Sequence, residues 1–125
     1  MSDYDNYFLR PRVVAGFYGL IGVALGAFGA HGLADYLAAN ESVQTWQTAV
    51  LYQLIHAVAL LALGRQTTRW RSLVWVWSLG IILFSGSLYV LALGGPGWLG
   101  PVTPIGGLLF ILGWLMLCFP NNGNS

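Results

Sequence analysis

Three side chains capable of hydrogen bonding or acid–base chemistry lie close together in an otherwise apolar stretch of this sequence. His56 follows Tyr52 by four residues and Gln53 by three, so in a helix the three point into one sector. An ionisable side chain in such a stretch suggests a functional site, and imidazole, which titrates close to neutral pH, suits a proton relay. The alternative is a neutral His56 that hydrogen-bonds to a neighbouring helix and has a purely structural role.

Hydroxyl groups on a later apolar stretch are the expected partners of His56. Ser85, Ser87 and Tyr89 are closely spaced there, and we expect them to meet His56 across the bundle. The candidate polar cluster inside the membrane is therefore Tyr52, Gln53, His56, Ser85, Ser87 and Tyr89. For the two serines, helix packing is the competing explanation, because no base that could activate them is evident.

The other histidine, His31, follows the run Gly26-Ala27-Phe28-Gly29-Ala30 and is a candidate for a separate site on the outer side. It is expected within one helical turn of the outer boundary, whereas His56 lies about 20 Å inward at 1.5 Å per residue. Two axial ligands of one haem would need nearly equal depth. A zinc site needs several ligands, and only Asp35 and Glu41 lie near His31 in the sequence. We therefore expect no metal and no cofactor.

Motifs of the well-known enzyme classes are absent from the sequence. It contains no nucleophile elbow, no phosphate-binding glycine loop, no HExxH zinc motif and no pair of carboxylates facing a common space. We therefore expect that the protein is not an enzyme.

The positions of the acidic residues weigh against a proton pathway. Every aspartate and glutamate falls in a tail or loop, whereas pumps and transporters usually carry carboxylates inside the membrane.

The elements that position these residues must lie in a bilayer, because the composition is unsuited to a soluble surface. Of the 125 residues, 57% are hydrophobic and 7% are charged, whereas soluble domains carry roughly 25% charged residues. Membrane lipids are thus the expected surroundings. A formal net charge of +1 leaves no basic face for nucleic acid. The single cysteine, Cys118, excludes a disulfide within the chain.

Four apolar stretches, at about residues 13–33, 43–63, 73–93 and 104–119, reach or approach the roughly 20 residues that a helix needs to cross a bilayer. They lack the alternation of barrel strands. The sequence predicts an all-α integral membrane four-helix bundle over 13–119, with an interfacial tail at 1–12 and a polar tail at 120–125. Thr103 and Pro104 are expected to cap and begin the fourth helix.

The distribution of basic residues predicts how the helices are oriented in the membrane. All five are arginines, at positions 10, 12, 65, 69 and 71. With four spans, the N-terminus, the loop between the second and third helices and the C-terminus share one side, and every arginine falls there. Under the positive-inside rule this side is cytoplasmic, which gives an N-in/C-in topology.

Glycines on two of the stretches predict close packing of helices. The residues expected to pack are Gly19, Gly22, Gly26 and Gly29 on the first helix and Gly106 and Gly113 on the fourth. Small residues let helix backbones approach, and close approach is a main source of helix association in lipid. The contacts could lie within one bundle or between copies of the chain. The alternative is that the glycines line a pathway or allow a hinge.

Several motifs, in order along the chain, resemble one protein family. They are Gly26-Ala27-Phe28-Gly29-Ala30-His31-Gly32, Thr48-Ala49-Val50 with Tyr52-Gln53 and His56-Ala57, Phe84-Ser85-Gly86-Ser87-Leu88-Tyr89, and Thr103-Pro104-Ile105-Gly106-Gly107 with Gly113-Trp114. Over about residues 13–119 the sequence resembles the small membrane proteins of domain-of-unknown-function family 423, which occur in bacterial inner membranes and have a mitochondrial relative in animals. The resemblance implies a four-helix protein of the bacterial inner membrane, or alternatively of a mitochondrial membrane, and assigns no catalytic residues.

Two classes of function remain open from the sequence. The first is a non-catalytic accessory, assembly or interaction subunit that packs against other membrane-protein subunits or copies of itself. The tryptophans Trp70, Trp75, Trp77, Trp98 and Trp114 would then be interfacial anchors or face lipid and partners. The loop 94–103, rich in glycine and proline, departs from the family pattern and could meet a partner. The alternative is a small-solute or proton conduit along a polar track around His56.

Overall fold

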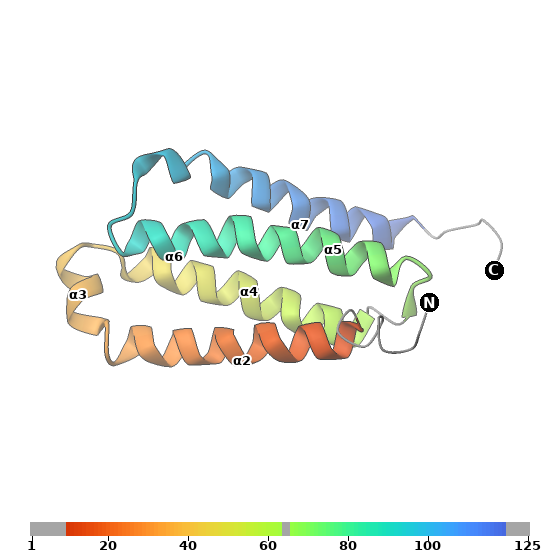
Figure 1. The fold of residues 1–125 in the computed structure, drawn as a ribbon, viewed down its shortest axis with the longest axis horizontal. Coiled ribbons are helices and arrows are strands. Elements are labelled where there is room, and N and C mark those ends of the chain that lie inside the picture. Colours follow the sequence, from red (N-terminus) through yellow and green to blue (C-terminus); the bar gives the residue numbers. More distant parts are fainter. Residues whose placement is uncertain (1–9, 64–65, 120–125) are drawn as a thin grey trace.

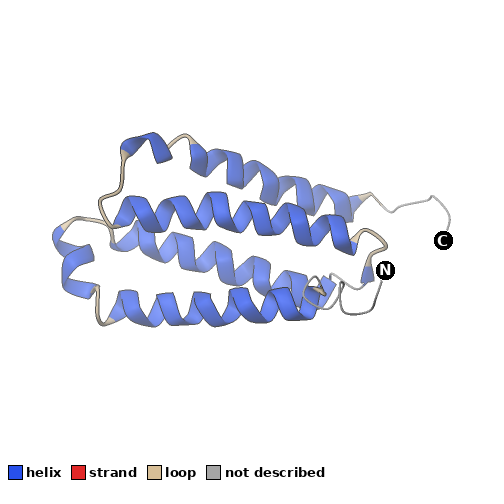
Figure 2. Cartoon of the chain, viewed as in Figure 1, coloured by secondary structure: helices blue, strands red, loops and turns tan. Residues whose placement is uncertain are grey.

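The computed structural model describes residues 10–63 and 66–119, and over these residues it consists of helices joined by short connections (Figure 1; Figure 2). The elements in order are α2 (Pro11–Ala30), α3 (Ala34–Ala39), α4 (Val43–Leu63), α5 (Trp70–Gly80), η2 (Ile81–Gly86), α6 (Ser87–Ala92), η3 (Gly97–Leu99) and α7 (Val102–Cys118). Most of the predicted tail at 1–12, Arg65 and the predicted tail at 120–125 lie outside the described residues.

Four helical stretches in this part of the chain are long and apolar enough to cross a membrane. They are Pro11–Ala30, Val43–Leu63, Trp70–Ala92 and Gly97–Cys118, with 20, 21, 23 and 22 residues. About 20 residues suffice to cross the hydrocarbon core. The stretch Trp70–Ala92 combines α5, η2 and α6 and is called the third span below. The predicted all-α fold with four membrane-spanning helices is confirmed.

The helix boundaries differ from the predicted ones at several places, among them the start of the third span, which is Trp70 rather than about Leu73. α2 ends at Ala30 rather than near Leu33, and a short helix follows that the sequence pattern does not predict. α7 begins at Val102, because Pro101 before it already has helical dihedral angles, φ −66° and ψ −18°. The predicted cap at Thr103 is therefore wrong. This residue lies inside the helix, and its hydroxyl makes a contact to another span.

The spanning helices follow one another in space in the order of the chain (Figure 1). α2 packs mainly on α4, α4 packs on the third span, and the third span packs on α7. α2 and α7 therefore lie on the two sides of a row. Within the chain, 11% of the α2 stretch and 17% of the α7 stretch are buried, against 39% for each of the two central spans. The two outer helices thus present most of their surface to the membrane.

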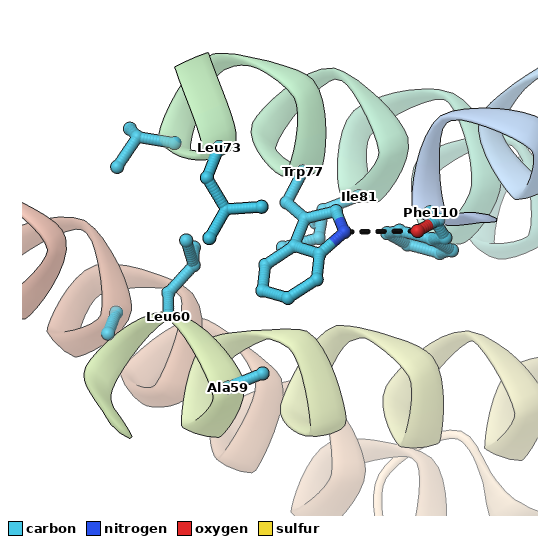
Figure 3. Packing of buried hydrophobic residues seen from close by; sticks show 8 residues of the cluster. Ala59, Leu60, Leu73, Trp77, Ile81 and Phe110 are labelled. Atoms are coloured by element: carbon cyan, nitrogen blue, oxygen red, sulfur yellow. Dashed lines mark hydrogen bonds between the residues drawn. The ribbon is translucent and has the colours of Figure 1, made fainter. Parts of the chain in front are cut away.

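Two groups of buried apolar side chains lie at different levels of the row. The larger comprises Ala15, Ala59, Leu60, Leu73, Val74, Trp77, Ile81 and Phe110 (Figure 3). The smaller comprises Leu37, Trp46 and Ala92. Because lipid tails are as apolar as these side chains, burial itself provides little driving force in a membrane, and close packing has to stabilise the helix contacts.

The short helix α3 covers one end of the row. Leu37 inserts into the smaller apolar group and is only 1% exposed. The hydroxyl of Tyr36 donates a hydrogen bond of 2.9 Å to the carbonyl oxygen of Leu93 at the end of the third span. We call this end the α3 end. The opposite end, where α2 and α5 begin (Figure 1), carries Arg10, Arg12, Arg69 and Arg71 and is called the arginine end.

The middle of the third span is the π-helix η2. π-Helical turns are rare in proteins and occur often at functional sites. At this level the backbone of α7 comes very close, since a Cβ added to Gly106 would collide with the backbone nitrogen of Phe84. Gly106 therefore allows η2 and α7 to meet backbone to backbone.

Candidate functional site

The structure places His56 just past the middle of α4 and buries it to 3% exposure. Its Nδ1 lies 2.8 Å from the carbonyl oxygen of Tyr52, and its Nε2 lies 3.0 Å from Nε1 of Trp114 on α7. An indole N–H can only donate, so Nε2 accepts, and Nδ1 carries the proton that is donated to the Tyr52 carbonyl. The bonding pattern assigns a single neutral tautomer to His56, and both of its ring nitrogens are engaged.

Aromatic rings enclose the His56 side chain. The Phe110 ring stacks on it with centroids 3.7 Å apart and planes 11° from parallel. The Trp77 ring meets it edge-on at 5.2 Å. Nε1 of Trp77 donates to the carbonyl oxygen of Phe110 at 3.1 Å (Figure 3), which ties the third span to α7 beside the histidine. The imidazole is thus held by both hydrogen bonds and ring contacts.

Glycines make room for these large rings. A Cβ added to Gly113 would collide with the indole of Trp77, and a Cβ added to Gly80 would lie 2.7 Å from Cδ1 of Phe110. Gly113 is one of the predicted packing residues, and the structure brings it against the third span. Its role is to admit an indole ring rather than another backbone.

A second set of hydrogen bonds centres on Gln53, which is 3% exposed. Its Nε2 donates to the carbonyl oxygen of Tyr18 on α2 at 2.9 Å. Its Oε1 accepts a 2.8 Å hydrogen bond from the hydroxyl of Tyr89 on α6. One amide therefore connects three helices, and both of its polar atoms have partners.

The two predicted serines make separate contacts. The hydroxyl of Ser85, in η2, donates to the carbonyl oxygen of Ala49 on α4 at 2.7 Å. The hydroxyl of Ser87 lies 2.6 Å from that of Thr103 on α7. Both serines are buried. They join the third span to its neighbours on either side.

The predicted pairing of His56 with Ser85, Ser87 and Tyr89 is wrong. Each of the three bonds elsewhere, and Ser85 lies at the level of Ala49, about 10 Å along α4 from His56 at 1.5 Å per residue. The residues of the predicted cluster therefore make separate contacts rather than forming one continuous track. Gln53 links to Tyr89, the serines bind helices on either side, and His56 binds Trp114.

Tyr52 does not share the buried sector of Gln53 and His56. It is 39% exposed, and its ring lies 4.7 Å from that of Phe84 and 6.2 Å from that of Phe110. Its hydroxyl makes no hydrogen bond to any residue that the structure describes. Tyr52 lines a groove of about 500 Å³ between α4 and α7, together with His56, Phe84, Gly107, Phe110 and Trp114. We call this the Tyr52 groove.

Two tryptophans have roles that the sequence pattern did not predict. Trp77, expected at an interface or facing lipid and partners, is 0% exposed, so that prediction is wrong. Trp114, placed in the same class, is 39% exposed and serves as the hydrogen-bond partner of His56. The signal available in the sequence was the indole N–H itself, because a tryptophan within an apolar span usually finds an acceptor.

The glycines of α2 divide into two groups. A Cβ added to Gly22 would lie 2.7 Å from a leucine side chain of α4, and one added to Gly26 would lie 3.2 Å from a valine side chain of the same helix. A Cβ added to Gly29 would collide with the Trp46 indole. These glycines therefore face α4. In contrast, a Cβ at Gly19, another predicted packing residue, would meet nothing within 4 Å. Gly19 makes no such close contact within the described chain.

His31 lies in the turn between α2 and α3 and is exposed. Its backbone N–H bonds to the carbonyl oxygens of Ala27 and Phe28. Among the residues with described positions, no three His, Cys, Asp or Glu side chains are grouped to hold a metal ion. A role for His31 as an outer-side site remains a prediction.

The sequence matches, over residues 25–107, a family described as protein of unknown function (DUF423). A UPF0382 membrane protein of Staphylococcus saprophyticus is 49% identical over 102 residues, which cover 78% of this chain and 84% of the relative. The UPF0382 inner membrane protein YgdD of Escherichia coli is 43% identical over 111 residues, covering 84% and 83% of the two chains. A UPF0382 membrane protein of Haemophilus influenzae is 39% identical over 118 residues, covering 91% and 92%. No solved structure matches the chain.

The names of these relatives and the four apolar helices both indicate a multi-pass protein of the bacterial inner membrane. The same names describe membrane proteins and give no activity. Both the length of the match and the level of identity make the relationship clear. The chain belongs to the DUF423 family of membrane proteins of unknown function.

Proposed function

We propose that the protein is a non-catalytic accessory or assembly subunit that packs against other membrane proteins or against copies of itself. The observation that carries the proposal is the unused glycine face of α2. A Cβ at Gly16 or at Gly19 would meet no atom within 4 Å, so neither glycine is needed for close contacts with the residues that the structure describes. A glycine within a helix costs about 1 kcal/mol relative to alanine. Its presence on a membrane-facing surface favours close approach of a helix from outside.

The state of the buried polar groups also supports this proposal. No buried side-chain nitrogen or oxygen among the described residues lacks a hydrogen-bond partner. The polar side chains therefore act as links between helices, as expected of a structural bundle. A proton conduit would need these groups to be hydrogen-bonded to one another along one continuous path, whereas Ser85, Ser87 and His56 each bind a different partner.

The alternative, a proton conduit through His56, needs the imidazole to accept and release protons. Adding a proton to Nε2 would break the bond from Trp114, and removing the one on Nδ1 would break the bond to the Tyr52 carbonyl. Four members of the predicted track make hydrogen bonds to other helices and none to His56: Gln53, Ser85, Ser87 and Tyr89. The geometry thus favours the accessory role over the conduit.

The test is to extract the tagged chain from its own membrane in a mild detergent and to measure the mass of the intact particle. We expect a stoichiometric assembly larger than the single chain. The variant Gly19→Leu should lower the fraction of the chain found in this assembly by at least half, because the larger side chain projects into the proposed contact.

A matched control is Gly86→Leu, since a Cβ at Gly86 also meets nothing within 4 Å but lies on the third span. This variant should leave the assembly intact if α2 carries the contact. Both variants should unfold at the temperature of the wild type. A wild-type chain that is monomeric when extracted, or an assembly that Gly19→Leu does not weaken, would contradict the proposal.

A further inference from the structure

The hydroxyl of Tyr52 is placed where an unpaired polar group is unfavourable. Tyr52 lies near the middle of α4, about 14 Å from one end of the helix and about 17 Å from the other at 1.5 Å per residue. Both distances exceed the reach of a tyrosine side chain, so the hydroxyl cannot extend to interfacial water. Hydrocarbon offers it no hydrogen bond. Among the described residues, none provides a partner either.

The other polar groups of the Tyr52 groove are occupied. Nε2 of His56 and Nε1 of Trp114 are bonded to each other, and Nδ1 of His56 is bonded to a backbone carbonyl. The lining thus offers one free hydrogen-bonding group, the phenol of Tyr52, on an otherwise apolar surface. A ligand that complements it needs an apolar body and an acceptor in the right position.

The walls of the Tyr52 groove favour a flat ligand. The rings of Tyr52 and His56 are 15° from parallel, those of Tyr52 and Phe110 are 18° from parallel, and those of His56 and Phe110 are 11° from parallel. Similarly oriented rings suit stacking with a planar ring. The volume of about 500 Å³ is within the usual range of about 300–1,000 Å³ for small-molecule pockets.

We propose that the Tyr52 groove binds a planar, carbonyl-bearing ring compound dissolved in the membrane, of the quinone class. Its carbonyl oxygen accepts a hydrogen bond from the Tyr52 hydroxyl, and its ring packs on the aromatic side chains of the groove. A phospholipid fits less well, because its oxygen atoms stay near the headgroups while Tyr52 lies at the middle of the membrane. The site is formed by a single chain and does not depend on the proposed accessory role.

The test is a calorimetric titration of the purified full chain in lipid nanodiscs with a short-chain alkyl benzoquinone, with the signal of empty nanodiscs subtracted. We expect saturable binding to one site per chain. The matching alkylbenzene, which has the same alkyl chain and a flat six-membered ring but no carbonyl, should bind at least about tenfold more weakly, since it cannot accept the hydrogen bond. This comparison needs no variant and so does not depend on folding.

Two variants locate the site. Tyr52→Phe removes only the hydroxyl and should weaken quinone binding about tenfold, whereas Tyr36→Phe, which removes a hydroxyl at the α3 end, should leave it unchanged. Gly107→Leu should fill the groove and abolish binding. A Cβ at Gly107 lies 3.7 Å from the Phe84 ring, an ordinary contact, and the variant's unfolding temperature shows whether the fold is kept.

Several results would overturn the proposal. The first is the absence of saturable binding to the wild-type chain, and the second is equal affinity for the quinone and the alkylbenzene. An unchanged affinity of Tyr52→Phe would have the same meaning. Since no partner protein is present in this titration, failure of the proposed accessory role would leave these results unaffected, and the two proposals can be judged separately.

Discussion

Nε1 of Trp114 lies 3.0 Å from Nε2 of His56, so a hydrogen bond joins α7 to α4. These helices are not neighbours in the row, because the third span packs between them. The bond therefore acts as a brace across the groove. It also fixes the tautomer of the histidine, and it explains how an ionisable residue can lie in the middle of a membrane protein without a charged partner.

Replacing the donor of this brace should destabilise the protein. In Trp114→Phe the Nε2 of His56 loses its partner, and we expect a loss of about 1–2 kcal/mol in unfolding free energy. Unfolding in a denaturing detergent would measure it. Trp98→Phe is the matched control, since Trp98 lies in the short helix η3 and is 69% exposed. Equal losses in both variants would show that the indole matters only through its size.

A Cβ at the position facing Trp77 should be poorly tolerated. Gly113→Ala places a methyl group against the buried indole, and we expect overpacking to cost about 1–3 kcal/mol. Gly107→Ala on the same helix is the control, because its methyl group would be at an ordinary distance of 3.7 Å from the Phe84 ring. The difference between the two unfolding temperatures is the measurement. If the two temperatures agree, the close packing described here does not limit stability.

Gln53 should be needed for stability because it provides hydrogen-bond partners for two groups on other helices. Gln53→Leu removes the bonds to the Tyr18 carbonyl and the Tyr89 hydroxyl. Such a bond in a membrane is worth about 0.6 kcal/mol on average and at most about 1.7 kcal/mol. Adding Tyr89→Phe should recover part of the loss, because the unpaired hydroxyl is then gone. Unfolding of the single and double variants in detergent tests this. Additive losses would contradict the shared hydrogen bond.

The predicted N-in/C-in topology can be tested with the single cysteine. Cys118 is exposed at the end of α7, at the arginine end. We expect that a membrane-impermeant maleimide does not label it in intact cells and does label it in inverted membrane vesicles. The control is Asn40→Cys in a Cys118→Ser chain, which places the thiol at the α3 end and should give the opposite pattern. Labelling of Cys118 in intact cells would reverse the topology.

The length of the apolar stretches was sufficient to predict the fold, because the thickness of the bilayer limits how short a spanning helix can be. The six-residue helix α3 could not be found this way. It is too short for a periodic pattern, and its position depends on Leu37 and Tyr36 meeting the far end of the third span. Local sequence does not contain that contact.

The sequence predicted polar residues of the candidate site that are buried in the structure, but it did not predict their hydrogen-bond partners. Sequence pattern was enough to single out Gln53 and His56, because polar residues are rare in such stretches, and both are buried in the structure. Their partners depend on how far each helix is rotated and shifted relative to the others. Ser85 lies in η2, where regular α-helical spacing does not apply. The spacing of residues on α4 contains no information on α7, which carries Trp114.

The π-helix η2 lies between the halves of the third span that contribute to the two apolar groups, and its first residue, Ile81, belongs to the larger group. An additional residue in a helical turn rotates all that follows by about 100° relative to an uninterrupted α-helix. α5 contributes Trp77 to the larger group and α6 contributes Ala92 to the smaller one, and the π-helical turn between them gives the two halves of the third span different angular phases. The protein thus resembles two short bundles, each with its own phase, that share one continuous helix. A one-residue deletion within 81–86 would restore a single phase and could fit only one of the two halves.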